Sequence, residues 1–155
     1  MAARTAEPRT VEEARQALAE AAAAGKRVRA QGGGTFLFLG GTVPAPDLTL
    51  RTTALTRTVF YEPEELVVKV EAGQTVAALL SRLAAKGQEV SWDEPWPERR
   101  TVGGVVAAGL AGPRRLAWGA PRDHVLGVTL LLPDGATARP GGRVVKNVAG
   151  YDLAR

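Results

Sequence analysis

Helix-forming and strand-forming patterns alternate along the first part of the chain. Thr10 and Glu13 form a capping box, in which the two side chains satisfy free N–H groups at a helix start. The alanine-rich sequence that follows has a high helix propensity as far as Ala24, and Gly25 supplies the left-handed stop. Residues 27–30 predict a short strand that leads directly into a run of glycines. A helix, a strand and a glycine-rich turn in this order indicate an α/β opening.

Three further strands and an amphipathic helix are predicted before residue 90. The strands are short, and the last of them is rich in β-branched side chains. They cover residues 47–51, 58–61 and 66–71. Thr75 caps a helix predicted over residues 76–86, which ends at Gly87. Its apolar side chains recur at helical spacing and are therefore expected in the core. These side chains are Val76, Leu79, Leu80 and Leu83.

The second half of the chain is richer in glycine. A loop with tryptophan and proline is expected over residues 91–100, and Thr101 caps a predicted helix of small residues over 102–109. Residues 125–132 and 135–139 predict a hairpin, because Asp-Gly between two strands is a strong turn signal. The length of 155 residues suits one domain with a real core.

Composition excludes several classes of protein. The chain contains no cysteine, which excludes a disulfide framework, a thiolate nucleophile and a cysteine-bound Fe–S or structural zinc site. No apolar run approaches the roughly eighteen residues of a membrane span. The first residues lack the apolar segment of a secretory signal. A reducing cytoplasm fits this composition.

The positive charge of the chain favours an anionic partner without identifying it. The formal net charge is +4 and the pI is about 10.0. The arginine pairs at 99–100 and 114–115 lie among glycines rather than along one helix face. No aromatic RNA-binding motif or zinc-finger spacing accompanies them, so no nucleic-acid partner is expected. They form either a solvated basic surface or a field that favours a pyrophosphate.

The first glycine-rich segment extends from Gln31 to Thr42 and contains three consecutive glycines. Such a run lets the backbone adopt positive φ and point successive N–H groups at an anion. The segment is not a Walker loop, because no Gly-Lys-Ser/Thr follows, and Leu37 replaces the third glycine of a dinucleotide fingerprint. Phosphate binding and a simple turn between strands both remain open. At least one of the three glycines is expected to have positive φ.

The second glycine-rich segment covers residues 101–112. A helix that opens with glycines offers unpaired N–H groups and the positive end of its dipole, which together suit an anion. We expect these N–H groups to face the first segment. The alternative is close packing through small residues, which needs no ligand.

Several short motifs follow one another in a fixed order. They are Gly-Gly-Gly-Thr35, Ala-Gly-Gln-Thr75 after a strand, Thr-Val-Gly-Gly104, Trp-Gly119 with Arg-Asp123, and Val-Leu-Gly127. This order resembles the vanillyl-alcohol-oxidase (PCMH-type) family of FAD-binding domains. Residues 101–115 and the sequence Lys-Asn-Val-Ala-Gly-Tyr-Asp152 resemble the glycolate oxidase E subunits within that family. The resemblance runs from about Arg9 to the last residue.

The resemblance implies an α+β fold, a PCMH-type FAD-binding domain of two α+β subdomains with FAD between them. The N-terminal subdomain would cover about residues 1–90, and the second would begin within about residues 91–155. Family members continue into a further strand that contacts FAD and into a substrate-binding domain. We therefore expect a C-terminally incomplete domain without the substrate domain, and no catalytic residue is assigned.

The resemblance also implies which residues line the FAD site. The pyrophosphate would be held by N–H groups of Gly32, Gly33, Gly34, Thr35 and Phe36, in a loop that includes Gln31, Gly41 and Thr42. The other side would be lined by Thr101, Val102, Gly103, Gly104, Ala107, Gly109, Gly112, Gly119 and Val128. FAD is expected to be non-covalent, because the first loop contains neither His nor Cys.

Other chemically interesting residues have simpler interpretations. His124 is the single histidine, so a catalytic triad or a multi-histidine metal site cannot form around it. It is expected to be a surface or hydrogen-bonded residue beside Asp123. Asp93 and Glu94 are neighbours in a loop, point apart and are expected to be solvated. No metal site is predicted.

Three tryptophans and two residues near the C-terminus have side chains that could lie near a flavin. Trp92, Trp96 and Trp118 could stack on flavin, but packing is the favoured role. Lys146 and Tyr151 lie in the family's Lys-Asn-x-x-Gly-Tyr-Asp segment and are expected to be structural or near the flavin.

Together these features predict an FAD-binding subunit of a glycolate (2-hydroxy acid) oxidase or dehydrogenase complex, in which the flavin accepts hydride from the hydroxy acid. The isolated chain is expected to be inactive. The implied partners are a second flavin subunit and an iron–sulfur subunit. The chain is expected in the cytoplasm, associated peripherally with the inner membrane through its partner subunits. A non-catalytic assembly subunit and the FAD domain of a D-lactate-type dehydrogenase remain as alternatives.

Overall fold

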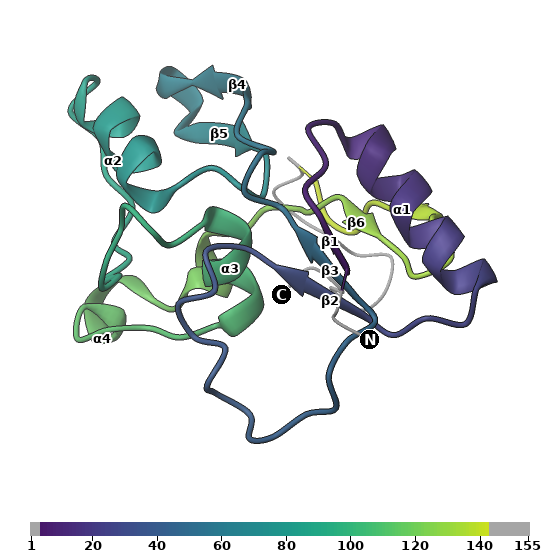
Figure 1. The fold of residues 1–155 in the computed structure, drawn as a ribbon. Coiled ribbons are helices and arrows are strands. Elements are labelled where there is room, and N and C mark those ends of the chain that lie inside the picture. The colour runs from purple at the N-terminus through teal and green to yellow at the C-terminus, as the bar shows by residue number, and fades with distance from the viewer. Residues whose placement is uncertain (1–3, 143–155) are drawn as a thin grey trace.

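The computed structural model of the chain describes residues 4–142, which form three small sheets with helices around them (Figure 1). The first sheet is parallel and has the strand order β1-β3-β2. Its strands are β1 (Arg4–Ala6), β2 (Val28–Gln31) and β3 (Leu48–Arg51). Helix α1 (Val11–Ala23) connects β1 to β2 and buries Ala14 and Ala21. The predictions of α1, β2 and β3 are confirmed, whereas β1 was missed.

The ends of α1 follow the predicted capping chemistry with one shift. The Thr10 hydroxyl accepts a hydrogen bond from the Glu13 N–H at 3.1 Å. The Glu13 carboxylate accepts from the Arg9 N–H at 2.8 Å, one residue before the helix cap. At the other end Gly25 has a φ of +60°, which a residue with a Cβ rarely adopts.

The second sheet and its helix also agree with the sequence pattern. Strands β4 (Thr58–Glu62) and β5 (Val67–Val70) are antiparallel and are joined by the short 3-10 helix η1 (Pro63–Glu65). Helix α2 (Val76–Ala84) begins at the Thr75 cap, whose hydroxyl accepts from the Ala78 N–H at 3.2 Å. The helix ends two residues earlier than predicted.

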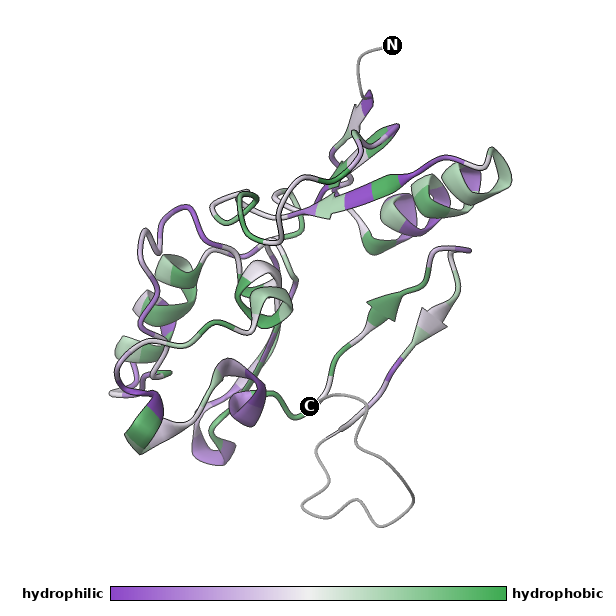
Figure 2. Cartoon of the chain, turned by 90° about the horizontal axis from the view of Figure 1, so that it is seen from below, coloured by the Kyte–Doolittle hydropathy of each residue, from purple (hydrophilic) through white to green (hydrophobic). Residues whose placement is uncertain are grey.

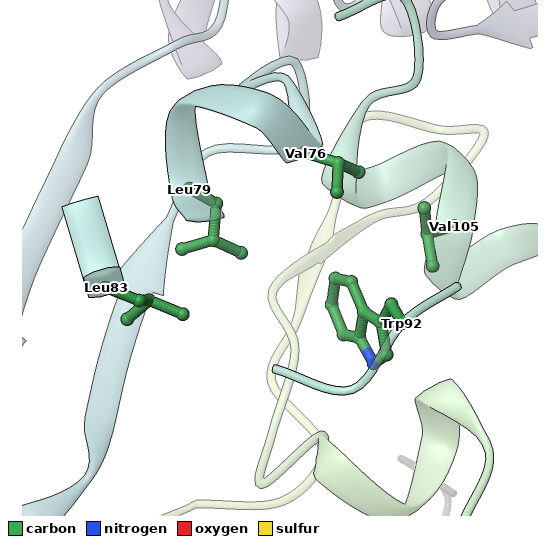
Figure 3. Packing of buried hydrophobic residues seen from close by; sticks show 5 residues of the cluster. All are labelled: Val76, Leu79, Leu83, Trp92 and Val105. Atoms are coloured by element: carbon green, nitrogen blue, oxygen red, sulfur yellow. The ribbon is translucent and has the colours of Figure 1, made fainter. Parts of the chain in front are cut away.

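The main apolar cluster joins α2 to the second half of the chain. Its buried side chains are Val76, Leu79, Leu83, Trp92 and Val105 (Figure 3). Leu80, also predicted in the core, is partly buried and packs against this cluster. Because the cluster crosses residue 90, it holds together both sides of the predicted subdomain boundary. The subdivision itself stays a prediction.

The second half contains short elements. They are α3 (Val102–Ala108), α4 (Arg115–Trp118), the 3-10 helix η2 (Pro121–His124), β6 (Leu130–Leu131) and β7 (Thr137–Ala138). The β6–β7 hairpin is shorter than predicted but turns at the predicted place, where Gly135 has a φ of +83°. A Cβ on Gly135 would lie 3.0 Å from the Cβ of Ala19, so the turn packs on α1 (Figure 2). Packing of the hairpin on α1 brings together the two ends of the described chain.

Candidate functional site

The first glycine-rich segment leaves β2 and lies against the residues that precede α3. Gly34 has a φ of +70°, which confirms the prediction of a positive φ among the three glycines. Gly32 and Gly33 serve a different purpose, because a Cβ there would lie 2.1 Å from the Thr101 hydroxyl oxygen and 1.7 Å from the Arg99 carbonyl oxygen, respectively. The first segment therefore packs against the Thr101 side chain at the start of the second segment and against the backbone of Arg99 just before it.

Five successive backbone N–H groups in this segment donate no hydrogen bond to any part of the chain that the structure describes. They belong to residues 32–36, which are all half-buried. The segment's anchoring bonds use other atoms: the Gln31 carbonyl accepts from the Thr52 N–H, and the Phe36 carbonyl accepts from the Leu39 N–H. Partly buried N–H groups require a partner such as water or a ligand. This cluster is therefore suited to an anion.

The N-terminus of α3 differs from the prediction. The Val102 N–H donates to the Gln74 carbonyl at 2.9 Å, and the Gly103 N–H donates to the Ala72 carbonyl at 2.9 Å. The Gly104 N–H donates to the hydroxyl of the Thr101 cap at 3.2 Å. The expectation of unpaired N–H groups directed at the first segment is thus wrong. What this helix end retains is the partial positive charge of its dipole.

Glycine at the start of α3 is explained by packing. A Cβ on Gly103 would lie 2.7 Å from the Cβ of Ala72 and 2.9 Å from the Ala72 carbonyl oxygen. Val102 is half-buried and packs against the apolar cluster. The alternative of close packing through small residues therefore describes this helix end.

The turn after α3 is shaped by two further predicted glycines. Gly109 ends the helix with a φ of +61°, and Ala107 is exposed two residues earlier. A Cβ on Gly112 would lie 2.3 Å from the Cβ of Asp93. The Asp93 carboxylate in turn accepts from the backbone N–H of Arg114 at 2.8 Å and from its Nε at 2.6 Å. This turn is therefore fastened to the tryptophan-containing loop.

The last two predicted residues lie further along the chain. Gly119 has a φ of +84°, and a Cβ there would meet the Asp123 carboxylate at 2.8 Å. Val128 is half-buried and donates its N–H to the Pro140 carbonyl at 3.1 Å. At the far end of the first segment, Gly41 has a φ of +80° and Thr42 is exposed. Gly41, Gly119 and Val128 thus have a local role in the backbone, and the role of all four positions toward a cofactor stays a prediction.

A buried ion pair next to the first segment was missed by the sequence analysis. Arg100 and Glu94 form it, and each side chain is only 3% exposed. The prediction that Asp93 and Glu94 diverge is confirmed, but the expectation that they are solvated is wrong for Glu94. Burial lowers the pKa of the Arg100 guanidinium, which nevertheless stays charged at any ordinary pH. A hydrophilic loop sequence carries no signal for such burial.

The tryptophans divide between packing and exposure. Trp92 is part of the apolar cluster, whereas Trp96 and Trp118 are 54% and 58% exposed. His124 is exposed, and its Nδ1 lies 3.4 Å from the Trp92 indole nitrogen and 3.2 Å from the Ala120 carbonyl oxygen. The expectation of a hydrogen-bonded surface histidine is confirmed.

The remaining expectations concern two residues near the C-terminus, metal binding and membrane-spanning helices. Lys146 and Tyr151 lie outside the described residues. Within residues 4–142, no group of three His, Cys, Asp or Glu side chains could hold a metal ion. In the same range, no helix is long and apolar enough to cross a membrane.

Comparison with known proteins identifies the family of the chain. A family profile described as an FAD binding domain matches residues 2–140. The chain is similar to the glycolate oxidase subunit GlcE of Escherichia coli K12, with 41% identity over 81% of this chain and 35% of the relative. It is 32% identical to the glycolate oxidase subunit GlcD of Bacillus subtilis over 81% of this chain and 27% of the relative. A D-lactate dehydrogenase of Archaeoglobus fulgidus is 32% identical over 79% of this chain and 27% of the relative.

A solved structure supports the PCMH-type α+β fold. An alkyldihydroxyacetonephosphate synthase matches with a TM-score of 0.81 and 19% sequence identity, over 97% of this chain and 27% of that one. At this identity the likeness concerns the fold alone. The chain spans about a third of the length of the curated relatives that it matches.

Proposed function

The chain belongs to the family of FAD-binding domains, and from this premise we propose that residues 32–36 hold the pyrophosphate of FAD within a 2-hydroxy-acid oxidising enzyme. The observation that carries the proposal is the run of five half-buried N–H groups without a partner in the described chain. Oriented amide groups of this kind are a common way to bind phosphate oxygens.

The local structure fits a diphosphate group. Gly32 and Gly33 have no side chain that could cover the N–H groups, and Gly34 turns the backbone with its positive φ. No residue between Gly32 and Thr42 carries a negative charge that would repel phosphate. The α3 dipole next to the loop adds partial positive charge without contributing a free N–H group. Residues 101–104, 107, 109, 112, 119 and 128 would line the cofactor through carbonyl oxygens, side chains and carbon surfaces.

The chemistry of the bound group determines the reaction class that we propose. FAD supplies a two-electron acceptor, and the substrate we propose is glycolate or a related 2-hydroxy acid. This chain's own residues bind the cofactor and orient it. The apolar cluster excludes water from the side of the site that it covers. The absence of a His or Cys in the first segment means that these contacts are non-covalent.

The names of two relatives support an assembly of several subunits. Both are named as subunits of a glycolate oxidase, and we propose that this chain also works with a second flavin subunit and an iron–sulfur subunit. We place this assembly in the cytoplasm, with contact to the inner membrane through those partners. Similarity to a D-lactate dehydrogenase favours D-lactate as the second candidate substrate.

Titration of the purified chain with FAD tests the proposal directly. We expect saturable binding that shifts the flavin absorbance spectrum, and complete release of the yellow colour into the supernatant after acid precipitation. Flavin that remains with the precipitate would show a covalent link and contradict the proposed contacts. No binding up to millimolar FAD would overturn the cofactor assignment for this chain. Turnover of glycolate or D-lactate, measured after addition of candidate partner subunits, then separates the two substrates.

A further inference from the structure

Arg100 is a buried cation at the junction of the two glycine-rich segments. The residue is 3% exposed, which is rare for arginine unless its charge is paired. Its backbone is fixed on both sides, because its carbonyl accepts from the Val76 N–H at 2.9 Å and its N–H donates to the Trp96 carbonyl at 3.0 Å. The next residue, Thr101, caps α3. The position of Arg100 is therefore set by the core rather than by the first segment.

The guanidinium of Arg100 connects two loops. On one side it forms the ion pair with Glu94, whose side chain is equally buried. On the other side its Cζ lies 4.2 Å from the centroid of the Phe36 ring, within the range of a cation–π interaction. Phe36 is the last of the five residues with a free N–H group. Its ring also lies 5.7 Å from that of Phe38 and 6.4 Å from that of Trp96.

The free N–H run is thus held at two points by consecutive residues. Its second residue, Gly33, packs against the Arg99 carbonyl oxygen, and its last residue, Phe36, lies on the Arg100 side chain. Attachment at these two points restricts the place and the direction of the donors between them. A loop that is ordered before it binds avoids the entropy loss of ordering it on binding.

We infer that Arg100 is a positioning residue for the cofactor, which holds the N–H groups of residues 32–36 in their binding arrangement through the ring of Phe36. This inference rests on the proposed function. Arg100 is too buried to be a direct ligand, since the guanidinium is enclosed by Glu94 and Phe36. Glu94 keeps the cation in place and compensates its charge.

The test compares FAD affinity among four variants of the full chain and a fifth that combines the first two. Arg100→Met combined with Glu94→Gln removes the cation without leaving a buried charge unpaired. Phe36→Leu removes the ring, Arg100→Lys keeps the charge, and Arg99→Met is the control at the exposed neighbour. Each protein is titrated with FAD well below its melting temperature, which is measured separately.

We expect the paired Arg100/Glu94 variant and Phe36→Leu each to weaken FAD binding by about threefold to thirtyfold. Combining them should weaken it no further, because both remove the same contact. Arg100→Lys should recover most of the affinity, and Arg99→Met should retain it.

Three outcomes would overturn the inference. Lower melting temperatures with unchanged FAD affinity would assign Arg100 a purely structural role. Additive effects of the two changes would show that Phe36 and Arg100 act independently. An equal loss in Arg99→Met would show that general positive charge matters instead. In all three cases the parent still binds FAD and the proposed function survives, whereas a parent that binds none removes both proposals.

Discussion

The two glycine-rich segments lie against each other, yet their backbone N–H groups are used in opposite ways. In the first segment the N–H groups of residues 32–36 have no partner in the described chain. In the second, those of Val102, Gly103 and Gly104 are all bonded within the protein. Glycine therefore allows close packing in both segments, but only in the first are the neighbouring backbone donors left without a partner in the described chain. Substitutions in each segment test this difference in the use of backbone N–H groups.

The largest effect is expected from Gly33→Ala. Its new Cβ would lie 1.7 Å from the Arg99 carbonyl oxygen, and backbone atoms cannot move away cheaply. We expect the free energy of unfolding to fall by about 3 kcal/mol or more. Gly40→Ala is the control for an added methyl group that meets no atom, because nothing lies within 4 Å of its Cβ. Its φ of +90° adds a backbone strain that Gly33 lacks, so that variant should still lose about 1–2 kcal/mol. Urea unfolding measures both, and equal losses would contradict the packing role of Gly33.

The next effect is on binding, through Thr35→Asp. This change places a carboxylate in the middle of the free N–H run without altering a glycine. Two unit charges about 4 Å apart repel by roughly 1 kcal/mol in water and about 4 kcal/mol at an effective dielectric of 20. FAD affinity should fall by on the order of tenfold to a thousandfold, and salt should restore part of it.

A control for Thr35→Asp adds the same charge elsewhere. Ser81→Asp lies on an exposed position of α2, away from both segments, and should leave FAD affinity within about twofold because such distant charges are screened. If both variants lose affinity equally, the effect is one of net charge and the first segment is not the phosphate site.

A smaller effect is expected from Thr101→Ala in the second segment. The variant removes the cap that accepts from the Gly104 N–H, which should cost about 1 kcal/mol of stability. Since the N–H groups of this helix end are already occupied, FAD affinity should change little once folding is complete. Thermal unfolding and FAD titration together check this. A loss of affinity larger than the loss of stability would show that the Thr101 hydroxyl itself contributes to the cofactor site, beyond its role as a helix cap.

The smallest effect is expected on the stability of the fold at acidic pH. Hydrogen bonds from the backbone and then the side chain of Arg114 lower the pKa of Asp93 below its ordinary value. A pKa lowered in the folded state gives stability that is present above the unfolded pKa of about 3.9 and is lost as the pH falls through the folded pKa. Asp93→Asn should therefore flatten the pH dependence of unfolding below about pH 4. An unchanged pH profile in Asp93→Asn would contradict the link between Asp93 and the turn at Gly112. The first segment has no titratable side chain and therefore does not contribute to this profile.

Local capping chemistry made much of the fold predictable. Thr10, Thr75 and Thr101 each accept from the N–H three residues later, as the sequence indicates. Strand β1 was missed because its three residues have no apolar alternation and are defined by pairing with β3. Element ends were shorter than predicted in α2 and in the hairpin, where packing rather than propensity sets the boundary.

The candidate site was predictable only in part. Three consecutive glycines after a strand identified the first segment, because their conformational freedom is a local property. The fate of the N–H groups at α3 was not predictable, since their acceptors, Ala72 and Gln74, lie about thirty residues earlier and meet the helix only in the folded chain. The burial of Arg100 and Glu94 has the same origin: a charged residue in a loop is buried only when distant elements close over it.

The strand order of the first sheet has a kinetic consequence. The middle strand, β3, is the last of the three in the chain, and Arg4 at one edge pairs with Leu48. Neither edge strand can pair until the central one arrives, so this sheet has no local nucleus, unlike the β4–β5 hairpin. Sheets assembled from such distant contacts form slowly. Refolding is therefore expected to be limited by docking of residues 48–51, and during that delay the short edge strands are open to pairing with other chains.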